Sequence, residues 1–369
     1  MVAPVTHSDR RRCFVQGNGT GSLGVVEQGN TRGSGNHHVV VIGASAGGLQ
    51  VLAQLLSELP KDLPASVFAV MHVGASSHLA QVLSHASTLP VLPAKSGRVI
   101  EPGHVYVAVP GAHMLIHDSH LLLRRGPREN FARPAIDPLF RSAACTFGGA
   151  VIGVVLSGAL SDGTSGLRAI KRCGGLTVVQ DPSDAAVPSM PRAALRAVCV
   201  DHVAKAAELG QLLDRLVRTP AAETPPIPAE IRLETAIAAH ELASMQTNEQ
   251  LGTPSRFICP ECHGGLWEIE DGGPLRFRCH VGHAYNGDTI LVSKGNDAET
   301  MLWKLLRTHQ ERAALARRMA AEEKSDDRLD LANTLLQRAH EYDEDAEIVR
   351  RLLENRTSPS EELDEHGSP

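Results

Sequence analysis

The stretch that most restricts the fold of this chain is residues 38–48, HVVVIGASAGG. A short, fully apolar run of this kind predicts a buried parallel strand. The glycines after it allow a sharp turn into the helical pattern LQVLAQLLSEL, because glycine adopts backbone conformations that other residues avoid. The stretch therefore predicts a strand, a tight turn and a helix N-terminus.

The same turn has two functional interpretations. Gly43-x-Ser45-x-Gly47 fits the pattern G-x-S-x-G, in which a serine hydroxyl stands on a strand-to-helix turn beside backbone N–H groups that can stabilise an oxyanion. The alternative is a dinucleotide-binding loop, which requires a glycine where Ser45 stands and an acidic residue at the end of the second strand. The second predicted strand, SVFAVMHV, ends in His72 instead.

From residue 38 to about 217, apolar runs alternate with helical patterns. The strand candidates are VVVIG, SVFAVMHV, HVYVAV, AVIGVVLSG and LTVVQD, and the helix candidates are LQVLAQLLSEL, HLAQVLSHAS, IDPLFRSAACTF, SGLRAIKRC and LGQLLDRLV. This alternation predicts an α/β fold with a doubly wound, mainly parallel, Rossmann-like sheet and helices on both faces. HVYVAVPGAHMLIHDSHLLLRR departs from the pattern and predicts two or three short strands at an antiparallel edge of the sheet.

Changes in composition divide the chain into six segments. They are a disordered extension at 1–36, the α/β domain at 37–217, a Pro-rich linker and helix at 218–250, a small Cys/His module at 251–292, a helical hairpin at 293–357 that is broken near Lys324-Ser325-Asp326, and an acidic tail at 358–369. The extension and the tail are too polar to form a core, and the prolines of the linker disfavour helix.

The composition also excludes several partners. A net charge of −6 and an aromatic content of 3% argue against nucleic acid, which selects basic surfaces and aromatic stacking platforms. No apolar run approaches the ~18–20 residues that span a bilayer, so we expect no membrane insertion. The chain has seven cysteines and no export signal, which favours a reducing cytoplasm over a disulfide framework. The four cysteines scattered through the first 200 residues are expected to be free thiols.

Three reactive side chains follow strands of the predicted sheet. Ser45 follows the first, His72 the second, and Asp162 lies in LSGALSDGTSG after AVIGVV. In an open parallel sheet, functional groups gather at the carboxyl ends of the strands, and a serine nucleophile needs an imidazole base and a carboxylate that orients it. Taken singly, Ser45 and Asp162 could cap helices and His72 could be a turn residue. Their joint placement favours a Ser-His-Asp triad.

Six segments carry a family resemblance. GASAGG, MHVGASS, PGHVYVAVPG, NFARPAIDPLF, LSGALSDGTSGL and QDPSDAAVPSMPRAAL occur in this order and spacing. Over about residues 37–217 the chain resembles the catalytic domain of the chemotaxis protein-glutamate methylesterases, the CheB family. The resemblance makes Ser45 the nucleophile, His72 the base and Asp162 the acid that orients the base.

The resemblance also assigns residues to the oxyanion site and cleft, namely Ala46, Gly47, Ala159 and Met190. Ala46 stands where the family often has threonine, and Ala159 where methionine is common, so the cleft differs from the usual one. Arg133 and Asp137 match a family stretch beside the active site. Their alternative role is a salt bridge and cap between a loop and a helix.

The resemblance implies hydrolysis of γ-glutamyl methyl esters on the cytoplasmic helices of a chemoreceptor, with release of methanol and without a catalytic cofactor. Some family members also deamidate glutamine, and a methyltransferase or other signalling protein is a further expected partner. The usual family protein carries an N-terminal receiver domain, for which 36 residues are too few, so we expect no phospho-regulation in cis. The alternatives are a non-catalytic signalling adaptor and an esterase or amidase that acts on another protein.

A cysteine cluster follows the linker. Cys259-x2-Cys262 is separated by sixteen residues from Cys279-x3-His283, a spacing typical of tetrahedral zinc. His283 is favoured as the fourth ligand because C-x3-H lets both side chains converge, with His280 and His263 as competitors. The alternative is three free thiols and unrelated histidines. The segment resembles a small Cys/His module of some stand-alone methylesterase-like proteins, and four protein ligands would make the zinc structural.

Overall fold

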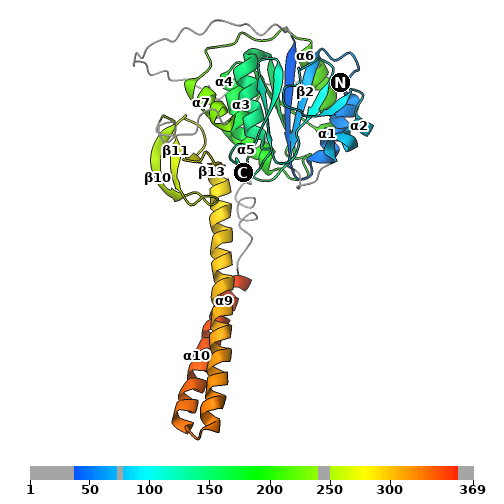
Figure 1. Cartoon of the computed structure of the whole chain (residues 1–369). Helices are drawn as coiled ribbons and strands as arrows, with labels where there is room; N and C mark the ends of the chain where they lie inside the picture. The colour runs from blue at the N-terminus through cyan, green and yellow to red at the C-terminus, as the bar shows by residue number, and fades with distance from the viewer. Residues whose placement is uncertain (1–36, 73–77, 240–249, 356–369) are drawn as a thin grey trace, which may run out of the picture.

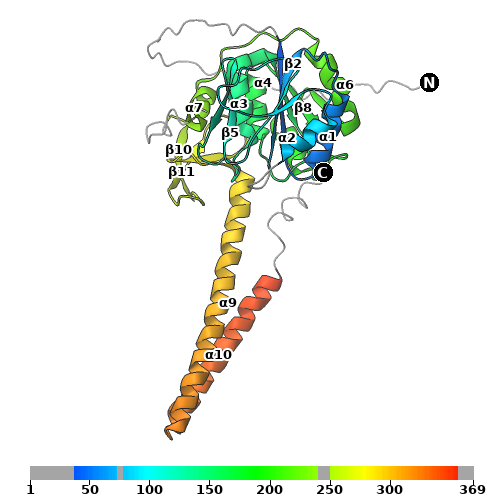
Figure 2. The same ribbon diagram turned by 45° about the vertical axis from the view of Figure 1, so that its right-hand side comes forward.

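The computed structural model describes residues 37–72, 78–239 and 250–355. An α/β body carries a small β module on one side, and a long helical hairpin projects away from both (Figure 1, Figure 2). The extension predicted at 1–36 and the tail predicted at 358–369 lie outside the described residues. Within the described ranges, no helix is both long and apolar enough to cross a bilayer.

The body is built on a parallel seven-stranded sheet in the order β3-β4-β2-β1-β7-β8-β9. Its strands are β1 (His38–Ala44), β2 (Ala65–Met71), β3 (Val91–Pro93), β4 (Val105–Val107), β7 (Val151–Val155), β8 (Leu176–Gln180) and β9 (His202–Ala204). Every residue of the central strand β1 is buried. This burial explains its continuous apolar run, because both faces of a central parallel strand are covered.

Helices cover both faces of this sheet, as Figure 1 shows. They are α1 (Gly48–Glu58), α2 (Leu79–Ala86), α3 (Ile136–Phe147), α4 (Thr164–Arg172), α5 (Ser189–Ala197) and α6 (Ala206–Val217), with a short 3-10 turn η1 (Gly148–Ala150) after α3. Alternate residues of β1 enter two apolar clusters: Val39 and Val41 pack with α3 residues, and Val40 and Ile42 with α1 residues. The predicted doubly wound α/β fold is therefore confirmed.

Two local predictions differ from the structure. β5 (His113–His117) and β6 (His120–Arg124) form a separate two-stranded hairpin, so the expected antiparallel edge of the main sheet is wrong. The apolar face of β5 packs on α3 instead, and the N–H of Ile116 donates to Ser142 Oγ of that helix at 3.0 Å. α5 was not predicted; its Pro191 lies in the first turn, where proline is tolerated.

One cysteine also departs from expectation. Cys145 and Cys173 are free thiols, as predicted. Cys199 is disulfide-bonded, so the expectation of free thiols is wrong at that position. Cys13, the remaining cysteine of the first 200 residues, lies outside the described residues.

The part of the chain beyond the body begins with α7 (Ala229–Ala238), followed by an antiparallel sheet of β10 (Gly252–Ile258), β11 (Gly265–Ile269), β12 (Arg276–Cys279) and β13 (Ala284–Asn286). α9 (Gly287–Ser325) starts directly after β13, and α10 (Leu329–Glu354) returns along it. The predicted break between two helices near 324–326 is confirmed. Buried alanines, among them Ala313 and Ala339, line the seam between the two helices.

Candidate active site and metal-binding cluster

The structure brings the three predicted catalytic side chains together. Ser45 follows β1, His72 follows β2, and Asp162 lies between β7 and α4. His72 Nδ1 is 3.1 Å from Ser45 Oγ, and His72 Nε2 is 2.8 Å from Asp162 Oδ2. The three residues form one continuous hydrogen-bonded chain, although 90 residues separate His72 from Asp162.

The topology of the sheet explains this convergence. The strand order turns from β2 on one side of β1 to β7 on the other, and the carboxyl ends of strands at such a switch point form a crevice. Backbone hydrogen bonds fix the loops there. The N–H of Ser45 donates to Ser157 O at 2.9 Å, and the N–H of His72 donates to Ala44 O at 3.2 Å.

Asp162 is buried and heavily hydrogen-bonded. Its Oδ2 accepts the N–H of Ile136 at 2.8 Å, and its Oδ1 accepts the side-chain amide of Asn130 at 3.1 Å. Burial alone would raise the pKa of Asp162, but the hydrogen bond and charge of His72, with Ile136 and Asn130, lower it to about 2. The carboxylate is therefore ionised at neutral pH and accepts the His72 Nε2 proton, which leaves Nδ1 free to accept the Ser45 hydroxyl.

A second buried carboxyl, Asp137, lies close by in the first turn of α3. Its Oδ1 accepts the N–H of Gly166 at 2.6 Å, which ties α3 to α4. Burial and the nearby charge of Asp162 raise its pKa well above the usual range. Arg133 donates instead to the carbonyls of Gly126 and Arg125, at 2.8 and 3.3 Å. The salt bridge considered for Arg133 and Asp137 is therefore not found between these two described residues.

The turn before α1 supplies the predicted oxyanion residues. Gly47 has φ +73°, and a Cβ there would lie 2.7 Å from Ala186 Cβ and 2.8 Å from Ser157 Oγ. Only glycine fits this position. Ala46 and Gly47 are both exposed at the N-terminus of α1, where helices leave backbone N–H groups without intrahelical partners.

The other two predicted cleft residues lie differently. Ala159 is exposed, whereas Met190 is fully buried. A Cβ on Gly158 would lie 2.0 Å from Met190 Sδ and 2.8 Å from Ser45 Cβ. Met190 and Ser45 therefore both lie close to Gly158, and the buried Met190 side chain is part of the packing that holds the Ser45 turn in place.

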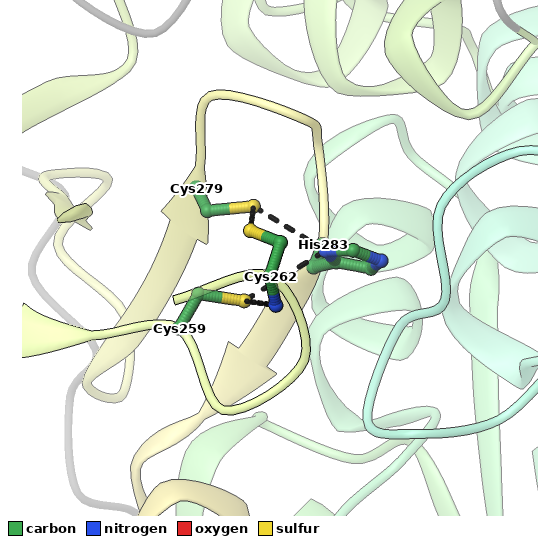
Figure 3. A group of neighbouring side chains, drawn as sticks. All are labelled: Cys259, Cys262, Cys279 and His283. Atoms are coloured by element: carbon green, nitrogen blue, oxygen red, sulfur yellow. Dashed lines mark hydrogen bonds between the residues drawn. The ribbon is translucent and has the colours of Figure 1, made fainter. Parts of the chain in front are cut away.

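The predicted metal ligands also converge, as Figure 3 shows. One ligand atom each from Cys259, Cys262, Cys279 and His283 lies within 4.8 Å of all the others. His283 Nδ1 is 3.5 Å from Cys279 Sγ and 3.7 Å from Cys259 Sγ, and the Cys262 and Cys279 sulfurs are 3.6 Å apart. A tetrahedral zinc ion with ordinary bond lengths places sulfurs about 3.7 Å apart and sulfur about 3.5 Å from nitrogen. The cluster has the dimensions of a metal site.

The competing histidines point elsewhere. His263 is exposed, and the ring of His280 packs edge-on against Trp267 with centroids 4.0 Å apart. His283 Nε2 is 3.7 Å from Glu261 Oε2, an arrangement typical of histidine ligands, whose second nitrogen faces a carboxylate. This geometry supports His283 as the fourth ligand.

Two residues of the site were not predicted. Asn130, which contacts Asp162, begins the segment NFARPAIDPLF that carries part of the family resemblance, but no role was assigned to it. Ser157 holds the nucleophile turn, since its Oγ donates to Ala46 O at 2.8 Å. Ser157 follows the apolar strand β7, and its position there did not predict a role in the site.

Known proteins resemble this chain over its α/β body. Residues 40–213 match the family described as CheB methylesterase. A putative protein-glutamate methylesterase/protein-glutamine glutaminase from Leptospira interrogans is 40% identical over 184 residues, which are 49% of this chain and 95% of that protein. An Anaeromyxobacter dehalogenans protein-glutamate methylesterase/protein-glutamine glutaminase is 40% identical over 182 residues, 49% of this chain and 53% of that protein.

Among solved structures, the catalytic domain of the Thermotoga maritima CheB methylesterase is 32% identical, with a TM-score of 0.47. The match covers 49% of this chain and 99% of that one. Because the Leptospira relative is matched over nearly its whole length, the family is established. The chain belongs to the CheB methylesterase family.

Proposed function

We propose that this chain is a serine hydrolase that removes methyl esters from glutamate side chains of chemoreceptor-type proteins. The observation that carries the proposal is the hydrogen-bonded chain from Ser45 through His72 to Asp162, in a member of the CheB methylesterase family. The names of its relatives include both methylesterase and glutaminase activity. Glutamine deamidation is the same acyl transfer with ammonia in place of methanol as the leaving group.

The proposed reaction follows from the geometry. Ser45 Oγ attacks the ester carbonyl while His72 Nδ1 takes the hydroxyl proton, and the charge of Asp162 stabilises the resulting imidazolium. N–H groups at the start of α1, from Ala46 and Gly47, stabilise the oxyanion. The intermediate collapses as His72 returns the proton to the leaving methoxide, giving methanol and a glutamyl ester of Ser45. Water, deprotonated by His72, then hydrolyses this ester to a glutamate carboxylate and free Ser45.

Two alternatives remain from the sequence. An adaptor would bind a partner without turnover, and it has no need of an ionised Asp162 aligned on His72; this favours an enzyme. A hydrolase that acts on a different protein ester or amide would use the same three residues. We place the reaction in the cytoplasm, where the free thiols of Cys145 and Cys173 would persist, whereas the disulfide at Cys199 gives this location no support.

The proposal predicts that the purified protein releases methanol from a methylated chemoreceptor cytoplasmic fragment. The assay measures volatile radioactivity from receptor methyl esters labelled in the methyl group, and binding of the same fragment is measured in parallel. Release that is proportional to enzyme concentration supports the hydrolase. Binding without release would favour the adaptor. Release from other methyl esters, with neither binding nor turnover of the receptor fragment, would favour a different substrate.

We further propose that Cys259, Cys262, Cys279 and His283 hold a structural zinc ion. Four protein ligands close the coordination sphere, so the metal would crosslink β10, β12 and the turn before β13 and would contribute folding energy. The dimensions of the cluster and the position of Glu261 beside His283 support this assignment.

The zinc proposal predicts about one zinc per chain in the purified protein. Cys262→Ser is expected to release the metal, measured by elemental analysis, and to increase hydrogen exchange beyond residue 250. Cys145→Ser is the matched control, because Cys145 is a free thiol far from the cluster in sequence, and it should retain the metal. Stoichiometric zinc in a Cys259/Cys262 double mutant would contradict the assignment.

A further inference from the structure

We propose that Asn130, which is held in place by β13 of the Cys/His module, is a positioning residue for Asp162, so that the module completes the active site of the α/β body. This inference rests on the proposed function of Ser45, His72 and Asp162. It makes the module part of the catalytic machinery, although the first strand of the module, β10, begins 90 positions after Asp162.

The first observation is a backbone connection. Loop residues 128–130 of the body run beside β13, where the N–H of Asn130 donates to Ala284 O at 2.8 Å and the N–H of Ala284 donates to Arg128 O at 3.2 Å. The rings of Phe131 and Tyr285 pack with centroids 5.1 Å apart. The loop is therefore attached to the module sheet like an additional strand.

The second observation concerns the Asn130 side chain. Its Oδ1 accepts the N–H of Asn286 at 2.9 Å, and its Nδ2 donates to Asp162 Oδ1 at 3.1 Å and lies 3.4 Å from Asp137 Oδ2. An N–H can pair only with the oxygen end of an amide, so Asn286 determines that the NH2 end faces the carboxylate. Asn130 also has φ +50°, a conformation that asparagine tolerates better than most residues.

The third observation is a set of hydrogen bonds between the module and Ser161, the residue before Asp162. Asn286 Nδ2 donates to Ser161 O at 3.1 Å and to Ser161 Oγ at 3.0 Å, and Ser161 Oγ donates to Asp288 Oδ1 at 2.7 Å. The segment 286–288, at the junction of β13 and α9, thus contacts the Asp162 loop from two directions. One contact goes through Asn130 and the other through Ser161.

Buried ion pairs fix the base of the same loop. Arg278 Nη2 of β12 lies 3.2 Å from Glu129 Oε1, and Arg141 of α3 binds the same carboxylate at 2.6 Å. All three side chains are at most 3% exposed. Because Glu129 immediately precedes Asn130, movement of the module would displace the Asn130 amide.

These contacts lead to a specific effect on catalysis. Asn130 occupies Oδ1 of Asp162 and leaves Oδ2 aligned on His72 Nε2. Without the amide, the carboxylate loses a hydrogen bond that fixes its rotation, and the imidazole is less well oriented. Since Asn130 is placed to act on Asp162 and not on substrate, we expect a change in kcat with KM unchanged.

The test compares the full-length protein with Asn130→Gly and Asn286→Ala. Glycine removes the amide yet accepts the positive φ, so the backbone of the loop is retained. Asn130→Gly is expected to lower kcat for methanol release about tenfold, with KM within twofold of wild type. Asn286→Ala should lower kcat by a smaller factor, because its backbone N–H remains. Asn296→Ala, on an exposed face of α9, is the matched control and should match wild type.

A spectroscopic readout separates this inference from the proposed function. The Nε2–H proton of His72 is observed by NMR and assigned from its loss in His72→Gln, and Asn130→Gly is expected to shift it and to speed its exchange with water. An unchanged resonance, an unchanged kcat, or a raised KM at unchanged kcat would overturn the positioning role. If wild type releases no more methanol than Ser45→Ala, the proposed function fails, and the resonance alone decides the role of Asn130.

Discussion

Ser45→Ala is expected to lower methanol release by at least about 10⁴-fold while the fold is retained. The Ser45 hydroxyl is the group that His72 Nδ1 contacts at 3.1 Å, and the variant leaves no hydroxyl at that position. Asp162→Asn should cause a loss of about 10⁴-fold, because an amide can donate a hydrogen bond to His72 Nε2. The imidazole would then carry its proton on Nδ1, where it cannot accept the serine proton.

Ser57→Ala is the matched control for the nucleophile. Ser57 lies on the exposed side of the same helix that starts after Ser45, and its Oγ donates to Gln54 O at 2.7 Å. The control should release methanol at the wild-type rate. If Ser45→Ala and Ser57→Ala release methanol equally, the chemistry does not take place at the turn before α1.

Removal of the Glu234 carboxylate is expected to cost about 3–5 kcal/mol of unfolding free energy. Glu234 is 1% exposed and meets three arginines, with Arg276 at 2.9 Å, Arg141 at 3.3 Å and Arg278 at 3.5 Å. Burial alone would raise the pKa of Glu234, but these guanidinium groups hold it well below its usual range. Without the carboxylate, buried positive charges face each other, and the salt bridges that remain to them in the described part of the chain are those with Glu129 and Asp271.

The measurement is urea unfolding of Glu234→Gln beside Glu230→Gln. Glu230 lies on the same helix, α7, and its pair with Arg172 is about one-third exposed, so its loss should cost less than about 1 kcal/mol. Because the Glu234 cluster joins α3, α7 and β12, its loss should destabilise the body and the module together. Equal stability of the two variants would contradict a role for the cluster in joining them.

The sequence was sufficient to predict the α/β body and the three converging side chains for one physical reason. Parallel strands with apolar cores end at the same edge of the sheet, so residues that follow them, such as Ser45 and His72, must lie near each other. The metal cluster could also be predicted from the sequence, because two pairs of ligands at short spacing indicate a metal site whatever the remaining fold is.

The contacts between the body and the module could not be predicted in this way. Glu129, Arg141, Glu234 and Arg278 come from a loop, α3, α7 and β12, and each charge taken singly is typical of an exposed position. Asn130 belongs to a segment without periodicity, and its partner Asn286 lies 156 residues later. The short strands β5 and β6 were predicted, but their separation from the main sheet was not, because alternation predicts strands without identifying the helix on which they pack.

The central claim is that Ser45 is a nucleophile activated by His72. The most direct test is the mass of the protein after reaction with a phosphonate ester that modifies activated serine residues. The account predicts one adduct per chain, located on the peptide that contains Ser45, and no adduct in His72→Ala. An adduct on a different residue, or an unmodified Ser45 in a protein that still releases methanol, would contradict it.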